Sequence, residues 1–223
     1  MKKYKYLFFD LDGTLIDSTD GITFSASMAL GHFGIYVTDK KELSKFIGPP
    51  LRDTFRDIYG IPEDRIDEAL HEYRKYYSAR GIFECEPYED IPLLLAALWK
   101  EGYRILLATS KPEVFAKKIL QFHRIDVYFW DICGANLDGT RERKEEVVEF
   151  AMSLCRAAPD EVLMIGDRSY DVLGAKAHGI DCVGVLWGFG TGEELEQAGA
   201  VAVYHTVKDL ARDLIDAARG SEL

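Results

Sequence analysis

From about residue 84 onward, the sequence alternates between short apolar runs and longer segments with helical spacing. The apolar runs lie at residues 104–108, 131–134, 162–165, 182–185 and 202–204. A further run of this kind, Tyr6–Phe9, lies near the N-terminus. Strands separated by helices in this way pair in parallel, and the helices cover both faces of their sheet. The pattern therefore predicts an α/β fold with a parallel sheet between two helical layers.

Residues 16–82 follow a different pattern, because their apolar side chains recur at helical intervals throughout. Ile22, Ala26 and Leu30 share one face of the first such segment, and Gly34 follows it as a stop signal. Three further segments of this type follow. Together with the first, they predict four helices and no strand. We therefore expect a helical domain, residues 16–82, inserted into an α/β domain made of residues 1–15 and 83–223.

The overall charge limits the possible partners. The 223 residues include 27 Lys and Arg against 38 Asp and Glu, which gives a formal net charge of −11. This balance disfavours binding to nucleic acid or to an anionic membrane. No stretch approaches the roughly 20 apolar residues of a membrane span, and the four cysteines are too scattered for a zinc or redox pair. We expect a cytoplasmic protein with reduced thiols, either a monomer or a homodimer.

Three of the predicted strands are each followed directly by a polar segment. Asp10 and Asp12 come after the first strand, residues 109–111 after the strand at 104–108, and residues 166–171 after the strand at 162–165. In open parallel sheets, ligands bind beyond the carboxyl ends of the strands. The sequence thus predicts a functional site at this edge.

The polar segments bring four carboxylates, Asp10, Asp12, Asp167 and Asp171, to that edge if the first strand neighbours the strand at 162–165. Close carboxylates cannot all stay ionised without a cation. Oxygen ligands with no His or Cys favour Mg²⁺, which shares its coordination sphere with water and substrate phosphate. Helix capping is the alternative for Asp167 and Asp171, and it explains either residue singly.

This set of residues is suited to phosphoryl transfer, which needs a nucleophile, a proton donor and positive charge around the phosphate. Asp10 can attack phosphorus, and Asp12 can act first as an acid and then as a base on water. Thr109 offers a hydroxyl, with backbone amides after it. Lys144, which opens the helix leading to residues 162–165, is the candidate cation. Its competitors are Lys111, Arg141 and Arg143.

At these residues the chain resembles the haloacid dehalogenase superfamily of phosphatases. The family's first motif appears as DLDGT at Asp10–Thr14, the second as LLATS at Leu106–Ser110, and the fourth as GDRSYD at Gly166–Asp171. Lys144 fits the third motif by position, although Glu145 follows it where many relatives have proline. The resemblance covers essentially the whole chain.

The resemblance implies a Rossmann-like core with a helical cap inserted after the first strand. It also implies that Asp10 is the nucleophile and Asp12 the acid/base. Asp10, the carbonyl of Asp12 and Asp167 would bind Mg²⁺, with Asp171 supporting the metal directly or through water.

Within the superfamily, the chain is similar to phosphoglycolate phosphatases and to a group described as 5′-nucleotidases, so the implied substrate is a small phosphorylated metabolite. Residues 46–51 and 184–190 look more like the second group. Expected substrate contacts are Gly13 and Ser110 in the core, and Gly48 and either Arg52 or Lys45 in the cap. The turn around Gly48 also fits an ordinary connection between helices.

Three other functions remain as alternatives. A sugar phosphomutase would share the aspartyl phosphate and the cap, and would return the phosphoryl group to a bound sugar. A dehalogenase would not need the second acid, Asp12, so its presence argues against that activity. A non-catalytic binding or regulatory protein is expected to lack one of the four acids, and all four are present.

Overall fold

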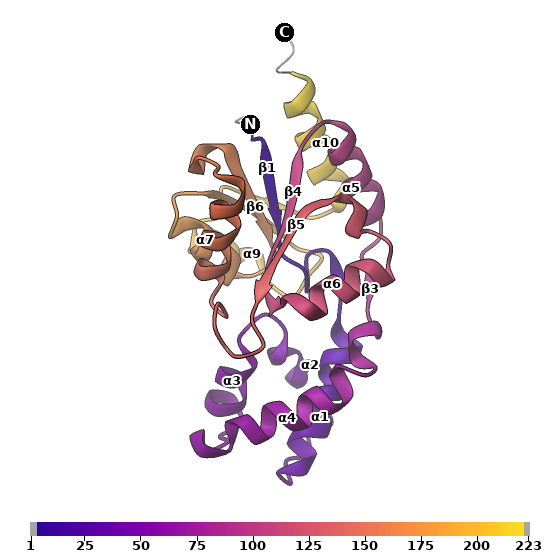
Figure 1. Ribbon diagram of the computed structural model, residues 1–223, viewed down its shortest axis with the longest axis vertical. Helices are drawn as coiled ribbons and strands as arrows, with labels where there is room; N and C mark the ends of the chain where they lie inside the picture. Colours follow the sequence, from indigo (N-terminus) through magenta and orange to yellow (C-terminus); the bar gives the residue numbers. More distant parts are fainter. Residues whose placement is uncertain (1–3, 221–223) are drawn as a thin grey trace. The chain divides into compact units, whose positions relative to one another are not determined.

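The computed structural model describes residues 4–220 of the chain. Six strands form one sheet in the order β5-β4-β1-β6-β7-β8, and each paired strand runs parallel to its neighbour (Figure 1). The strands are β1 (Tyr6–Phe9), β4 (Arg104–Pro112), β5 (Phe129–Ala135), β6 (Val162–Gly166), β7 (Asp181–Val185) and β8 (Ala202–Tyr204). The predicted α/β fold with a parallel sheet is confirmed.

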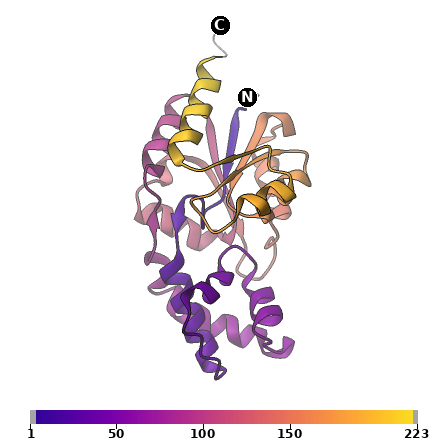
Figure 2. The ribbon, with the colours of Figure 1, turned by 180° about the vertical axis from the view of Figure 1, so that it is seen from behind.

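Helices form a layer on each face of this sheet. They are α5 (Ile91–Lys100), α6 (Glu113–Phe122), α7 (Lys144–Cys155), α8 (Ser169–Lys176), α9 (Gly192–Ala198) and α10 (Val207–Arg219). Figure 1 shows α7 and α9 on one side of the sheet and α5 and α10 on the other, and Figure 2 shows the same separation from behind. The core thus has three layers, as the sequence predicts.

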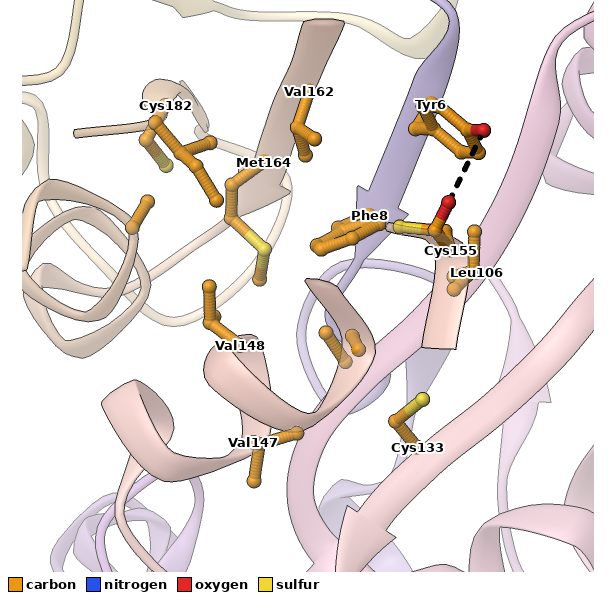
Figure 3. Packing of buried hydrophobic residues seen from close by; sticks show 14 of the residues in the cluster. Tyr6, Phe8, Leu106, Cys133, Val147, Val148, Cys155, Val162, Met164 and Cys182 are labelled. Carbon is orange, nitrogen blue, oxygen red and sulfur yellow. Dashed lines mark hydrogen bonds between the residues drawn. The ribbon is translucent and has the colours of Figure 1, made fainter. Parts of the chain in front are cut away.

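The buried core explains why β1 and β6 are unbroken apolar runs. Alternate residues of a strand point to opposite faces, and on the face toward α7 the side chains of Phe8 and Met164 pack near Val148 of that helix (Figure 3). Full burial of a side chain such as Phe8 contributes about 1.5–3 kcal/mol. Tyr6 donates from its hydroxyl to the carbonyl of Cys155 at 3.4 Å, which ties β1 to the end of α7.

The chain divides into two compact units, Met1–Asp17 with Pro87–Leu223 and Ser18–Glu86. The second unit is built from helical segments. Its α-helices are α1 (Thr19–His32), α2 (Lys40–Leu43), α3 (Leu51–Asp53) and α4 (Ile66–Tyr77). It also contains 3₁₀ turns at Ser44–Phe46, Glu63–Arg65 and Gly81–Phe83 and a π turn at Thr54–Ile58. Among the described residues, no helix is both long and apolar enough to cross a membrane.

The expectation of helix from Ile16 onward is wrong. Residues Ile16–Asp17 form a short strand, β2, which pairs with β3 (Glu86–Pro87). The amides of Leu15 and Ile16 both donate to the carbonyl of Leu11, at 2.9 and 3.0 Å. This closes a tight loop over the DLDGT motif itself, and the chain leaves it in an extended conformation before α1 begins.

Two further details differ from the sequence prediction. Strand β4 does not end at residue 108 but continues to Pro112, with a shift in register against β5 after Thr109. Helix α9 was not predicted, because in its seven residues only Leu195 is buried and no apolar period is visible. Both details matter for the motifs. Lys111, near the end of β4, contacts Asp12 of the DLDGT motif. Glu194, in the first turn of α9, contacts Ser169 of the GDRSYD motif.

Candidate active site

The strand register brings three of the motifs to one edge of the sheet. Strand β1 lies between β4 and β6, and Phe9 pairs with both Leu107 and Ile165. Asp10 is one residue further along, so it lies level with the start of the Thr109 segment on one side and the Asp167 segment on the other. The edge is the carboxyl end of all three strands, where ligands bind in parallel sheets.

At this edge Asp10, Asp167 and Asp171 form a buried acidic cluster. One carboxylate oxygen from each lies within 4.8 Å of the others. Lys144, at the start of α7, places its Nζ 2.7 Å from Asp10 Oδ1 and 2.7 Å from Asp171 Oδ1. The same Nζ donates to the carbonyl of Ala108 at 3.1 Å. If all three carboxyl groups were ionised, one lysine would leave two negative charges uncompensated within this group.

The electrostatic cost of that arrangement is visible in the pKa values. Burial, with Asp171 and Asp12 nearby, raises the pKa of Asp10 to about 6 although Lys144 acts in the opposite direction. Burial and the other two acids also raise the pKa of Asp167 well above its ordinary value. Burial alone would lower the pKa of Lys144, but Asp10 and Asp171 hold it above its usual range. The cluster therefore favours the addition of positive charge.

The residues present fit a divalent cation. Asp171 Oδ1 is buried and has no hydrogen-bond partner among the described residues, although it forms an ion pair with Lys144. Its other oxygen, Oδ2, accepts from the amide of Arg168 at 3.0 Å. Three carboxylates without His or Cys form the oxygen-rich set that Mg²⁺ prefers. Asp10, Asp167 and Asp171 are thus the side chains that can hold the ion.

Asp12 lies apart from that cluster and has its own cation. Lys111 Nζ donates to both carboxylate oxygens of Asp12, at 2.8 and 2.7 Å, and its side chain is almost fully buried. The site therefore contains two buried lysines, one for each acid of the DLDGT motif.

The two arginines considered as alternatives to Lys144 have other partners. Arg141 donates to the carbonyl of Gly134 at 2.7 Å and forms an ion pair with Glu113 at 3.0 Å. Arg143 has a largely exposed side chain that lies 3.6 Å from Glu145. Of the four candidate cations, the two lysines form ion pairs with the motif aspartates.

Short polar residues complete the core part of the site. Thr109 is buried, and its Oγ1 accepts from the amide of Lys111 at 3.2 Å, whereas Ser110 is half-buried. Gly13 has a φ of +86°, and a Cβ there would lie 2.2 Å from Asp167 Oδ2. Only glycine therefore fits at this position. Thr14 donates from Oγ1 to Asp167 Oδ1 at 3.3 Å.

Sequence reasoning did not assign the segment after β7 to the site. The amide of Phe189 donates to Asp167 Oδ2 at 2.8 Å, and Trp187 Nε1 donates to the carbonyl of Thr14 at 2.9 Å. A Cβ at Gly188 would lie 2.5 Å from Asp167 Oδ2. Two glycines flanking an aromatic residue after a strand were the available signal that the backbone here approaches another group closely.

The predicted cap residues lie in the second unit. Arg52 forms ion pairs with Asp67 and, at 3.8 Å, with Glu63. Gly48 has a φ of +103°, which accounts for a glycine in the turn before α3. Lys45 is exposed.

Without a bound cation, the folded protein is expected to lose stability as the pH rises from about 4 to above 6. In this interval folded Asp10, with its pKa of about 6, keeps a proton that the unfolded chain has released, so a rise in pH favours unfolding. A divalent cation binds carboxylates in their deprotonated form. Thermal unfolding of EDTA-treated protein should therefore show a larger gain from MgCl₂ at about pH 7.5 than at about pH 5. Equal gains at both pH values would contradict this assignment.

The described site thus combines a three-layer α/β fold, buried aspartates after adjacent parallel strands and a lysine at the start of α7. The chain belongs to the haloacid dehalogenase-like hydrolases, whose family model matches residues 7–185. It is 44% identical over 193 residues to a 5′-nucleotidase of Pseudomonas aeruginosa, covering 86% of this chain and 87% of that one. It is 41% identical over 208 residues to tyrosine-protein kinase PtkA of Mycobacterium tuberculosis, covering 92% and 71%.

Among solved structures, the chain is similar to a crystal structure of a predicted phosphatase from Clostridium acetobutylicum. The TM-score is 0.93 at 42% sequence identity, over 96% of this chain and 99% of that one. The part of this chain left uncovered is much shorter than either compact unit. The similarity therefore includes both units.

Proposed function

We propose that this protein is a Mg²⁺-dependent phosphatase that hydrolyses a small phosphomonoester through an aspartyl phosphate on Asp10. The observation that carries the proposal is the buried cluster in which Asp10 contacts Lys144 and lies within reach of Asp167 and Asp171. The family and its relatives named as phosphatases support hydrolysis of phosphoric monoesters, and the cluster offers a carboxylate nucleophile and a cation for that reaction.

In the first step, a carboxylate oxygen of Asp10 forms a bond to phosphorus while the ester P–O bond breaks. Asp12 gives a proton to the departing oxygen, then takes one from the water that hydrolyses the aspartyl phosphate. Lys111 holds both Asp12 oxygens, so at least one of these bonds opens before Asp12 carries a proton. Lys144 fixes the orientation of Asp10. Bound Mg²⁺ supplies positive charge for the phosphoryl oxygens.

For the substrate, we favour a 5′-nucleotide over 2-phosphoglycolate, on the strength of the 5′-nucleotidase relative. Thr109, Ser110 and Gly13 would contact the phosphate. Gly48 and Arg52 of the helical unit would contact the rest of the molecule. We place the enzyme in the cytoplasm, because its four cysteines are scattered along the chain and buried, as is typical of reduced thiols.

Assays of purified protein test this function. p-Nitrophenyl phosphate should be hydrolysed with MgCl₂ and not with excess EDTA, a difference of roughly 100-fold or more. In a panel of 5′-nucleoside monophosphates, 2-phosphoglycolate and hexose phosphates, the nucleotides are expected to show the highest kcat/KM, and Arg52→Ala should change the ranking. If none of these compounds released inorganic phosphate, the proposal would be refuted. An isomerised hexose phosphate among the products would indicate a mutase.

A further inference from the structure

The segment Trp187–Glu194, here called the clasp segment, leads from β7 into α9 and runs along the loop that carries Asp167. Within it, the Phe189 amide donates to Asp167 Oδ2 at 2.8 Å. A Cβ on Gly190 would lie 1.8 Å from the carbonyl oxygen of Asp167, so the two backbones are in direct contact there. The clasp segment therefore contacts both the side chain and the main chain of Asp167.

The clasp segment ends at Glu194, which makes the contacts to the next two residues of that loop. Glu194 Oε1 accepts from the Ser169 amide at 2.8 Å, from Ser169 Oγ at 2.8 Å and from Arg168 Nε at 3.0 Å. The Ser169 amide is the first of α8 and has no partner within its own helix. Glu194 is held in turn, since its amide donates to Thr191 Oγ1 at 3.2 Å.

Arg168 and Ser169 lie in the short segment that joins Asp167 to Asp171. The Arg168 amide donates to Asp171 Oδ2 at 3.0 Å, while Asp171 Oδ1 lies 2.7 Å from Lys144 Nζ. A displacement of these two residues would thus change the separation of Asp167 and Asp171. A carboxylate that accepts three hydrogen bonds, two of them from one residue, restricts such a displacement.

We infer that Glu194 is a positioning residue for the metal site: through Arg168 and Ser169 it fixes Asp167 and Asp171 at the separation that one Mg²⁺ requires. The inference rests on the proposed function, because it takes the acidic cluster to bind Mg²⁺. Residues that orient metal ligands from outside the coordination sphere commonly alter metal affinity by about 10–100-fold.

The test is Glu194→Gln, which keeps the size of the side chain and removes its charge. We expect its dissociation constant for Mg²⁺, measured by titration calorimetry with MgCl₂ alone, to rise roughly tenfold. Excess MgCl₂ should restore kcat to near the wild-type value. Glu193→Gln is the matched control, because Glu193 lies in the same helical turn and contacts Gln197 instead, at 3.0 Å. Its Mg²⁺ affinity should not change.

An unchanged Mg²⁺ affinity in Glu194→Gln, or an equal loss in Glu193→Gln, would overturn the inference. If Glu194→Gln does not fold, as judged by circular dichroism, Ser169→Ala decides, since it removes one of the three bonds. It should weaken Mg²⁺ binding by roughly threefold, and no loss would overturn the inference. If Asp167→Asn binds Mg²⁺ as well as wild type does, the proposed function itself fails.

Discussion

Asp10→Asn is expected to abolish turnover, lowering kcat by roughly 10⁵-fold at saturating Mg²⁺. The amide has nearly the shape of the carboxylate but cannot attack phosphorus, so no aspartyl phosphate can form. Steady-state assays measure the loss of rate. Mass spectrometry after acid quench should find a phosphate adduct on the peptide that contains residue 10 in the wild type and none in the variant.

Asp160→Asn is the control for this substitution, because it makes the same chemical change at an exposed position before β6. It should retain wild-type activity. If the Asp10→Asn variant kept more than about a tenth of the wild-type kcat, or if the adduct were found on another residue, Asp10 would not be the nucleophile.

Lys144→Met is expected to have the second-largest effect, and to affect stability as well as rate. The substitution leaves Asp10, Asp167 and Asp171 buried without a protein cation. Removing one partner of a buried ion pair costs about 3–5 kcal/mol. Urea unfolding in EDTA should show a loss of this size, and MgCl₂ should recover part of it. The kcat should fall on the order of 10³-fold, since the orientation and charge that Lys144 supplies are gone.

Lys118→Met provides the comparison, since Lys118 is exposed on α6. We expect its stability to change by less than about 0.5 kcal/mol. A Lys144→Met variant that unfolds at the wild-type urea concentration in EDTA would show that this lysine does not offset the buried charge. A variant that is destabilised but hydrolyses its substrate at the wild-type rate would assign Lys144 a purely structural role.

The fold class could be predicted because the most buried strands, such as β1 and β6, are apolar runs and most intervening segments have helical spacing. The edge that carries the site follows from the same pattern, since Asp10 and Asp167 come directly after strands. The order of the strands was not available from periodicity. It is the position of β1 between β4 and β6 that brings Asp10 and Asp167 together.

Other parts of the site could not be predicted, for identifiable reasons. The contact of Lys111 with Asp12 depends on an irregular continuation of β4, where the register shifts after Thr109. The Phe189 amide binds Asp167 from a loop that has no period. A main-chain donor leaves no trace in its own side chain, and the two flanking glycines indicate a close approach without identifying its partner. Thr191 followed three residues later by Glu194 is a helix-start pattern, but it does not reveal that Glu194 bonds another helix.

The close approach of Gly13 and Gly188 to Asp167 has a consequence for mutational surveys of this enzyme. Replacing most residues with alanine deletes atoms, but at these two positions it adds a methyl group within 2.5 Å of a carboxylate oxygen. A survey that ranks positions by lost activity would therefore rank Gly13 and Gly188 as high as reactive residues, although glycine has no reactive group. Their intolerance would measure the space around the aspartate and reveal nothing about chemistry of their own.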